Sequence, residues 1–165
     1  MNVDLSNIEG KIVMPQEGFQ EAFVSSSADV IWGGGNLGGG KSIALALAMY
    51  PLMLDPDFRC LISRRAIQSL KAGGGFVEKF KQMYGEYCTI KESDNPRISF
   101  PNGSFCDLTY IDDSDMVKLR ERAKGWEYDA IGVDEMTEMS FECFMYIMTR
   151  NRGNSKTFTL GKKVA

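Results

Sequence analysis

The most informative segment of this 165-residue sequence is residues 35–42, Gly35-Asn36-Leu37-Gly38-Gly39-Gly40-Lys41-Ser42. It matches the pattern G-x-x-x-x-G-K-[ST], the Walker A motif or phosphate loop (P-loop). Its glycines let the backbone turn tightly, so that successive N–H groups point at phosphate oxygens. We expect these residues to surround the phosphates of a nucleotide, with Lys41 between the β- and γ-phosphates and the Ser42 hydroxyl on Mg²⁺.

The segments on either side fit this interpretation. Residues 29–32 form a short apolar run, which predicts a buried strand. Residues 42–50 are rich in Ala and Leu, which predicts a helix that Pro51 limits. A phosphate loop lies between a strand and a helix, because the positive N-terminal end of the helix adds to the anion site.

Two carboxylates follow another apolar run. Residues 128–133 predict a buried strand, and Asp134 and Glu135 come directly after it. Acidic pairs at strand ends are more often solvated loop residues, but an upstream phosphate loop reverses that balance, because open α/β sheets bind ligands at the carboxyl ends of their strands. We expect Asp134 to hold Mg²⁺ through water and Glu135 to orient or deprotonate an attacking water.

The remaining residues alternate between strand and helix patterns. Asn102-Gly103 lies between two runs of alternating polarity, which predicts a β-hairpin over residues 97–110. The order of elements predicts an α/β domain with a mostly parallel sheet flanked by helices. The further elements that we expect are helices within residues 15–23, 66–83, 113–123 and 140–150 and an interior strand at 59–63, with Phe19, Ala22 and Phe23 on one face of the first helix and a break at glycines 73–75 in the second.

The composition excludes several kinds of chemistry. The chain is 44% hydrophobic and 25% charged, which is ordinary for a globular domain, and it contains no histidine. The absence of histidine excludes Ser-His-Asp and Cys-His catalysis and His-ligated metals. Its four cysteines are widely spaced and predict neither a zinc site nor a redox pair. A net charge of −3 gives no general attraction for nucleic acid, and no run predicts a membrane span or signal peptide.

Several motifs together resemble one family. They are Gln20, the phosphate loop, Ser63-Arg64-Arg65, Ile98-Ser99-Phe100-Pro101-Asn102-Gly103-Ser104, Gly125-Trp126, Val133-Asp134-Glu135-Met136-Thr137 and Thr149-Arg150-Asn151-Arg152. Over roughly residues 15–152 the chain resembles the ATPase domain of the large terminase subunit of tailed bacteriophages, the motor that packages DNA into procapsids. The phosphate loop and the Asp-Glu pair are shared with many ATPases, whereas the combination with the hairpin and the closing R-x-R is more specific.

The resemblance implies a P-loop NTPase of the additional-strand, catalytic-glutamate type that uses ATP and Mg²⁺. By this resemblance Gln20 matches the glutamine that recognises adenine, and Lys41 and Ser42 match the phosphate and metal ligands. Asp134 matches the metal carboxylate and Glu135 the catalytic glutamate. An arginine that many members carry inside the phosphate loop has no counterpart here, where the sequence is Asn36-Leu37.

The resemblance also implies partners and boundaries. We expect a flexible arm at 1–14, the ATPase domain at 15–152 and a tail at 153–165, in which residues 156–160 are the candidate for a final strand. The implied partners are double-stranded DNA, the portal, the small terminase subunit and further copies of the chain, in the host cytoplasm and without a membrane. The family's coupling motif and nuclease domain would follow Ala165, so we expect marginal stability and slow hydrolysis from this chain alone.

Two alternatives stay open at this stage. The chain is compatible with another P-loop ATPase, helicase-like or a kinase, and with a nucleotide-binding domain that does not catalyse. Arg64, Arg65, Arg150 and Arg152 lie at the ends of predicted elements, where an arginine either senses the γ-phosphate or caps carbonyls. We assign none of them as an arginine finger.

Overall fold

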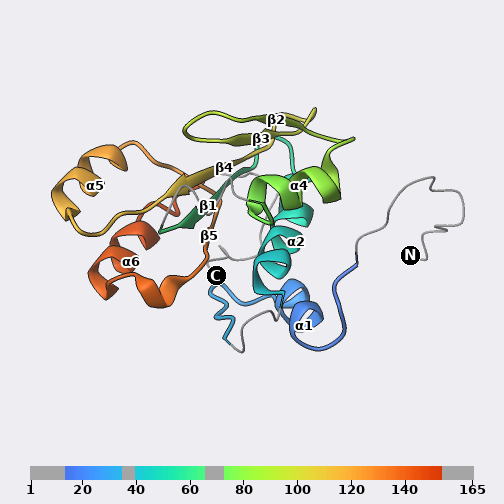
Figure 1. Ribbon diagram of the computed structural model, residues 1–165, viewed down its shortest axis with the longest axis horizontal. Helices are drawn as coiled ribbons and strands as arrows, with labels where there is room; N and C mark the ends of the chain where they lie inside the picture. The colour runs from blue at the N-terminus through green and yellow to red at the C-terminus, as the bar shows by residue number, and fades with distance from the viewer. Residues whose placement is uncertain (1–13, 35–39, 66–72, 154–165) are drawn as a thin grey trace, which may run out of the picture.

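A five-stranded sheet runs through the computed structural model, which describes residues 14–34, 40–65 and 73–153 (Figure 1). The strand order is β2-β3-β4-β1-β5. β1 pairs in parallel with β4 on one side and with β5 on the other, while β2-β3 and β3-β4 are antiparallel. The strands are β1 (Arg59–Arg64), β2 (Thr89–Lys91), β3 (Arg97–Ser99), β4 (Phe105–Tyr110) and β5 (Ala130–Val133).

Helices cover the two faces of the sheet with separate cores. The first face carries α1 (Phe19–Ser25), α2 (Lys41–Met53) and α4 (Phe76–Tyr84), which pack on Cys60 and Ile62 of β1. The second carries α5 (Met116–Arg122) and α6 (Phe141–Met148), which pack on Leu61 of the same strand. Successive residues of β1 therefore enter opposite cores, as side chains of a strand covered on both faces must.

The predicted hairpin is confirmed. Phe100 N donates to Ser104 O at 2.9 Å and Gly103 N donates to Phe100 O at 3.1 Å, which closes the turn between β3 and β4. Gly103 has φ of 94°, a left-handed conformation that glycine adopts without strain. The third strand of this antiparallel part, β2, was not predicted, because it is short and its residues are largely exposed.

The predicted strand at residues 29–32 is wrong. The structure has only a single bridge residue there, Val30, and the side chain of Trp32 is 60% exposed. An apolar run becomes a strand only when a neighbouring strand satisfies its backbone groups. Among the described residues β5 pairs with β1 alone, and this segment adds no ladder beyond the single bridge at Val30.

The helices follow the sequence with two corrections. Pro51 does not limit α2, which continues to Met53; proline lacks an N–H but its own φ suits a helix. α1 ends two residues beyond the expected range of 15–23, and its buried residues are Gln20 and Phe23, whereas Ala22 is exposed. α4 begins directly after Gly75, and α5, α6, β1 and β5 lie within the predicted ranges or within one residue of them.

Predictions for residues 1–13, 35–39, 66–72 and 154–165 lie outside the described residues. No described helix has the length and apolar character to span a bilayer.

Candidate functional site

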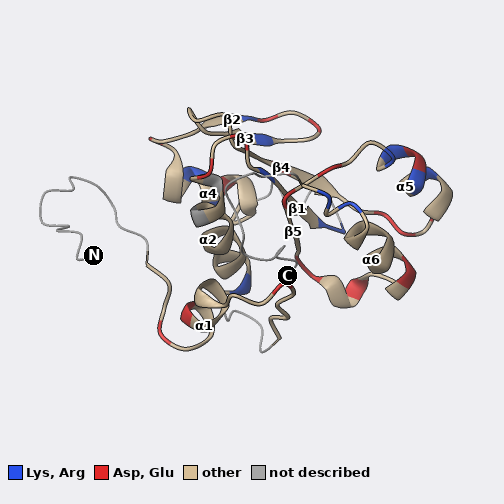
Figure 2. Cartoon of the chain, turned by 180° about the vertical axis from the view of Figure 1, so that it is seen from behind, with Lys and Arg blue, Asp and Glu red and all other residues tan. Residues whose placement is uncertain are grey.

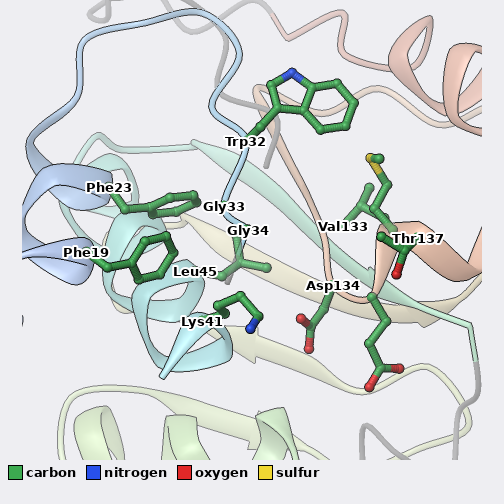
Figure 3. Close-up of a pocket in the computed structure, with 12 residues that line it drawn as sticks. Phe19, Phe23, Trp32, Gly33, Gly34, Lys41, Leu45, Val133, Asp134 and Thr137 are labelled. Atoms are coloured by element: carbon green, nitrogen blue, oxygen red, sulfur yellow. The ribbon is translucent and has the colours of Figure 1, made fainter. Parts of the chain in front are cut away.

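A pocket of about 440 Å³ opens beside the N-terminus of α2 (Figure 3). Phe19 and Phe23 from α1 lie on one side of it, Asp134 and Thr137 lie on the other, and Lys41 lies between them. The described residues that line it are Phe19, Phe23, Trp32, Gly33, Gly34, Lys41, Leu45, Val133, Asp134, Glu135, Met136 and Thr137. The pocket thus joins an apolar wall to a charged end, as a nucleotide with an aromatic base and a polyphosphate requires.

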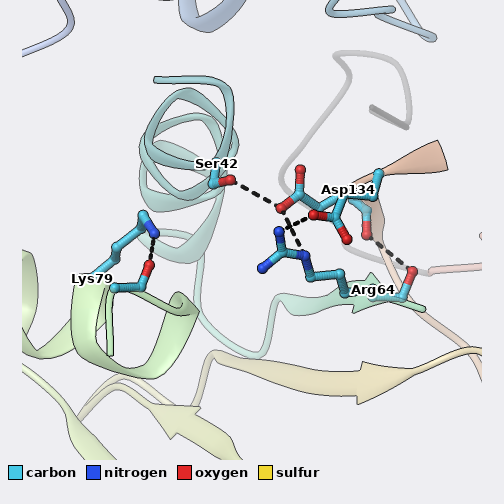
Figure 4. A network of polar contacts seen from close by, with 8 residues as sticks. Ser42, Arg64, Lys79 and Asp134 are labelled. Carbon is cyan, nitrogen blue, oxygen red and sulfur yellow. Dashed lines mark hydrogen bonds and ion pairs between the residues drawn. The ribbon is translucent and has the colours of Figure 1, made fainter. Parts of the chain in front are cut away.

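The two predicted metal ligands are in direct contact. The Ser42 hydroxyl donates to Asp134 Oδ2 at 2.9 Å (Figure 4). Ser42 lies in the first turn of α2 and Asp134 directly follows β5, so this helix and this strand bring the two side chains together. Gly132 of β5 lies against α2, because a Cβ there would be 2.7 Å from Leu45 Cδ1.

Arg64 contacts both carboxylates. Its Nε lies 3.6 Å from Asp134 Oδ2, and its Nη2 donates to Glu135 Oε1 (Figure 4). The hydrogen bond to Glu135 is the largest of the effects that raise the pKa of the Arg64 guanidinium, and the negative charge of Asp134 adds to it while burial opposes it. Arg64 is therefore a fixed positive charge between the two acidic side chains.

Glu135 has a backbone conformation that is unusual for its residue type. Its φ is 58° and its ψ is 38°, in the left-handed region, and it caps the short 3-10 helix Met136–Glu138. Residues other than glycine rarely adopt this backbone conformation, and those that do cluster at functional sites. The turn that results directs the chain from β5 along the side of the pocket, where Met136 and Thr137 line it.

Gln20 connects α1 to the end of the predicted phosphate loop. Its amide oxygen accepts from Gln16 N at 2.9 Å, and its Nε2 donates to Gly40 O at 3.4 Å. Gly40 has φ of 67°, a left-handed conformation that favours glycine, and a Cβ there would lie 2.2 Å from that Nε2, so the Gln20 amide would have to move. Gln20 is buried and is not among the residues that line the pocket, and its role in adenine recognition stays a prediction.

The other arginines make local contacts. Arg65 Nη1 donates to Glu138 O at 2.9 Å, which holds the 3-10 helix against the end of β1. The Arg150 guanidinium lies 5.0 Å from the Tyr146 ring centre, and Arg152 Nε donates to Thr149 O at 2.7 Å. These contacts are the carbonyl-capping and surface roles that compete with an arginine-finger role at element ends.

Solved structures of phage terminases share this arrangement of strands and helices. The large terminase of a thermophilic bacteriophage matches with a TM-score of 0.65 at 12% identity, over 92% of this chain and 38% of the terminase. The same terminase in complex with ADP matches with a TM-score of 0.63 at 14% identity, over 88% and 37%. The large terminase ATPase domain of Thermus phage P74-26 matches with a TM-score of 0.56 at 13% identity, over 91% and 64%.

The chain has the fold of a phage large-terminase ATPase domain. It spans less than two-fifths of the length of the thermophilic phage's terminase. No protein-family model and no curated protein sequence matches it, so the likeness is one of fold. The terminase fold is also what the sequence motifs resemble, and the predicted α/β architecture is confirmed.

Within this terminase fold the structure brings four of the predicted site residues together. Lys41, Asp134 and Glu135 line one pocket, and Ser42 bonds to Asp134. Residues 35–39 of the predicted phosphate loop lie outside the described residues. The contact of Arg64 with the carboxylates was not predicted. The register of the sheet explains this contact, because β1 and β5 are parallel neighbours in which Ser63 pairs with Val133, so the residues that follow each lie side by side.

Proposed function

We propose that this chain is a Mg²⁺-dependent ATPase and the motor domain of a phage DNA-packaging terminase. The observation that carries the proposal is the contact between Ser42 and Asp134 beside a pocket that also contains Lys41 and Glu135. This contact joins a residue of the segment 35–42 to a residue of the pair Asp134-Glu135, the two motifs that we expect to act in nucleotide hydrolysis. The resemblance of the sequence motifs and the terminase fold support the same assignment.

The residues present fit a magnesium ion. A hydroxyl and a carboxylate oxygen in contact are hard oxygen donors, and Mg²⁺ bound with a nucleotide takes one or two protein oxygens, with phosphate oxygens and water completing the set. The described residues contain no group of three or more His, Cys, Asp or Glu that would form a separate metal cage. Ser42 and Asp134 would hold the ion, which when bound neutralises charge on the phosphates.

The remaining groups have separate roles in the proposed hydrolysis. Lys41 neutralises charge on the β- and γ-phosphates. Glu135 accepts a proton from the water whose oxygen attacks the γ-phosphorus, and the bond from that phosphorus to the bridging oxygen breaks to leave ADP. In the structure Glu135 is bonded to Arg64, so its carboxylate must exchange that partner for the water.

The test separates binding from hydrolysis. Lys41→Ala should weaken ATP binding roughly ten- to a hundredfold in calorimetry, since a charge-assisted contact contributes about 1.5–3 kcal/mol. Glu135→Gln should bind Mg-ATP as the unaltered chain does, while phosphate release without any added acceptor falls about a hundredfold. Glu142→Gln, an exposed glutamate on α6, is the matched control. Wild-type turnover in Glu135→Gln would contradict the proposed role.

The proposed partners follow from the terminase assignment. They are double-stranded DNA, a portal, a small terminase subunit and further copies of this chain, in the cytoplasm of the host. Phosphate release without an acceptor also separates this assignment from a kinase, which transfers the γ-phosphate to a second substrate. Stimulation of the ATPase by duplex DNA would support the packaging role.

A further inference from the structure

A second pocket, of about 370 Å³, lies away from the proposed nucleotide site. It is bounded by the β2–β3 hairpin, the middle of β4 and the segment between α5 and β5, and it shares no lining residue with the first pocket. Lining residues of this pocket lie in one row across the sheet, in which Lys91 pairs with Arg97, Arg97 with Asp107, and Asp107 with Leu61. Paired residues point to the same face of a sheet, and Leu61 belongs to the core under α5 and α6. The pocket therefore lies on the face of the sheet that α5 and α6 cover.

Of the three basic residues that line this pocket, one is in an ion pair with a described residue and two are not. Arg97 is neutralised, because its Nε and Nη2 donate to the two oxygens of Asp107 at 2.6 and 2.8 Å. The Tyr128 hydroxyl adds a third hydrogen bond to that carboxylate at 2.9 Å, and burial raises the pKa of Tyr128 so that the phenol keeps its proton. Lys91 and Arg122 have no ion-pair partner among the described residues; Arg122 donates to a carbonyl, Tyr110 O, at 2.6 Å. The pocket therefore presents two cations without a direct ion pair to a described residue, although the Arg122 charge also acts on the nearby Asp112 carboxylate and helps to lower its pKa.

Flat groups line the same pocket. The half-buried Trp126 indole lies with its ring centre 5.7 Å from the Arg122 guanidinium, and it meets the Tyr128 ring edge-on at 6.3 Å. The side chains of Ser93, Asn95 and Thr109 add hydrogen-bonding groups to the wall. Figure 2 shows basic residues on β3 and α5, the two elements on either side of this pocket. An indole, a guanidinium and unpaired cations are the groups that bind a base and its phosphate in single-stranded nucleic acids.

We propose that this second pocket binds one nucleotide of a single-stranded nucleic acid, with the base against Trp126 and Arg122 and the phosphate at Lys91. The volume is within the range of pockets that hold molecules of this size, about 300–1,000 Å³. A duplex does not supply this ligand, because its bases are stacked on each other and their faces are not accessible. The proposal does not rest on ATP hydrolysis at the first pocket.

The experiment is a fluorescence-anisotropy titration of an end-labelled oligothymidylate of about 12 nucleotides, without ATP or Mg²⁺. Trp126→Ala should weaken binding roughly 5- to 150-fold, and Trp126→Phe, which keeps a ring for stacking, should retain most of it. Lys91→Ala should weaken binding and reduce the slope of log affinity against log salt by about one. Circular-dichroism melts establish that each variant is folded, and Lys91 is exposed, so its variant tests the site even if Trp126→Ala does not fold.

The control is Lys118→Ala, which removes the same charge from the outer side of α5, where the Lys118 side chain is 83% exposed. It should bind the oligonucleotide as the unaltered chain does. An equal loss in Lys91→Ala and Lys118→Ala would overturn the proposal in favour of general electrostatic attraction. Equal or tighter binding of a duplex of the same length would overturn the single-strand assignment. Displacement by thymidine monophosphate at matched nucleotide concentration would assign the pocket to a free nucleotide instead.

Discussion

The hydroxyl of Ser42 and a carboxylate oxygen of Asp134 lie 2.9 Å apart although 92 positions separate them in the chain. The same oxygen, Asp134 Oδ2, is 3.6 Å from Arg64 Nε. Three elements that are distant in sequence, α2, β1 and the end of β5, therefore converge on one atom (Figure 4). The packing of α2 against β5 determines this geometry, so the fold itself prepares the site.

Replacing Ser42 should separate metal-dependent from metal-independent binding. Ser42→Ala removes one of the two oxygen donors proposed for Mg²⁺, so affinity for Mg-ATP should fall by at least roughly tenfold. Affinity for ADP in EDTA should not change, because that complex does not use the hydroxyl. Calorimetric titrations with and without Mg²⁺ measure both quantities. Ser42→Thr keeps the hydroxyl and should behave as the unaltered chain; an equal loss in both variants would contradict the assignment.

The ion pair between Arg64 and Glu135 should appear as a coupling energy. Without nucleotide, Arg64→Gln and Glu135→Gln should each lower the free energy of unfolding, and the double variant should lose less than the sum. The expected coupling is about 0.5–1 kcal/mol, since the Arg64 side chain is only 21% exposed. Urea unfolding of the four proteins measures it. The Arg120–Glu142 pair, 52% and 64% exposed, is the control and should couple less strongly; a larger coupling there would contradict the argument.

Gly153 should be essential for the stability of the fold. A Cβ at Gly153 would lie 1.7 Å from Asp129 Oδ1 and 2.3 Å from Asp129 Cα, and the backbone atom cannot move aside without displacing the start of β5. Gly153→Ala should therefore lower the free energy of unfolding by about 1–3 kcal/mol or more. Gly125→Ala is the matched control, because no atom lies within 4 Å of its added Cβ. Equal melting temperatures for the two variants would contradict the close contact.

Stability should decrease in acid partly through Asp113. Its carboxylate accepts the backbone N–H of Ser140, the residue that caps α6, at 2.6 Å, and this hydrogen bond lowers the pKa of Asp113 below its ordinary 3.8. A carboxyl whose pKa is lower in the folded state than in the unfolded state stabilises the fold when the pH is above its unfolded-state pKa. That stabilisation is lost as the pH falls through the folded-state pKa. Asp113→Asn should therefore melt below the unaltered chain at about pH 6, and the difference should shrink as the pH falls below the ordinary pKa of 3.8. A constant difference across this range would exclude the linkage.

Local sequence patterns were sufficient to predict the elements that a turn motif or a continuous apolar run identifies. The hairpin at Asn102-Gly103 and the interior strands β1 and β5 are examples, because turn chemistry and continuous apolar runs identify them without further context. The run at 29–32 has the same apolar character, yet it is not a strand, because pairing depends on a neighbour that the run itself does not specify. β2 shows the converse: three largely exposed residues form a strand because β3 lies beside them.

The candidate site was predictable as far as its chemistry follows from motifs. The pattern of residues 35–42 and the pair Asp134-Glu135 identified groups that the structure places at one pocket, as far as it describes them. The aromatic wall and the Arg64 contact depend on which elements become neighbours in space. For Arg64 that information was the parallel register of two strands, which sequence periodicity does not provide.

The left-handed backbone of Glu135 has a consequence for how this chain balances stability against activity. A residue with a side chain at φ of 58° costs the fold about 1 kcal/mol relative to glycine. Glu135→Gly should therefore be at least as stable as the unaltered chain, despite losing the bond to Arg64, while it lacks the carboxylate that the proposed hydrolysis needs. The glutamate thus keeps a carboxylate at the pocket in a backbone conformation that would suit glycine better.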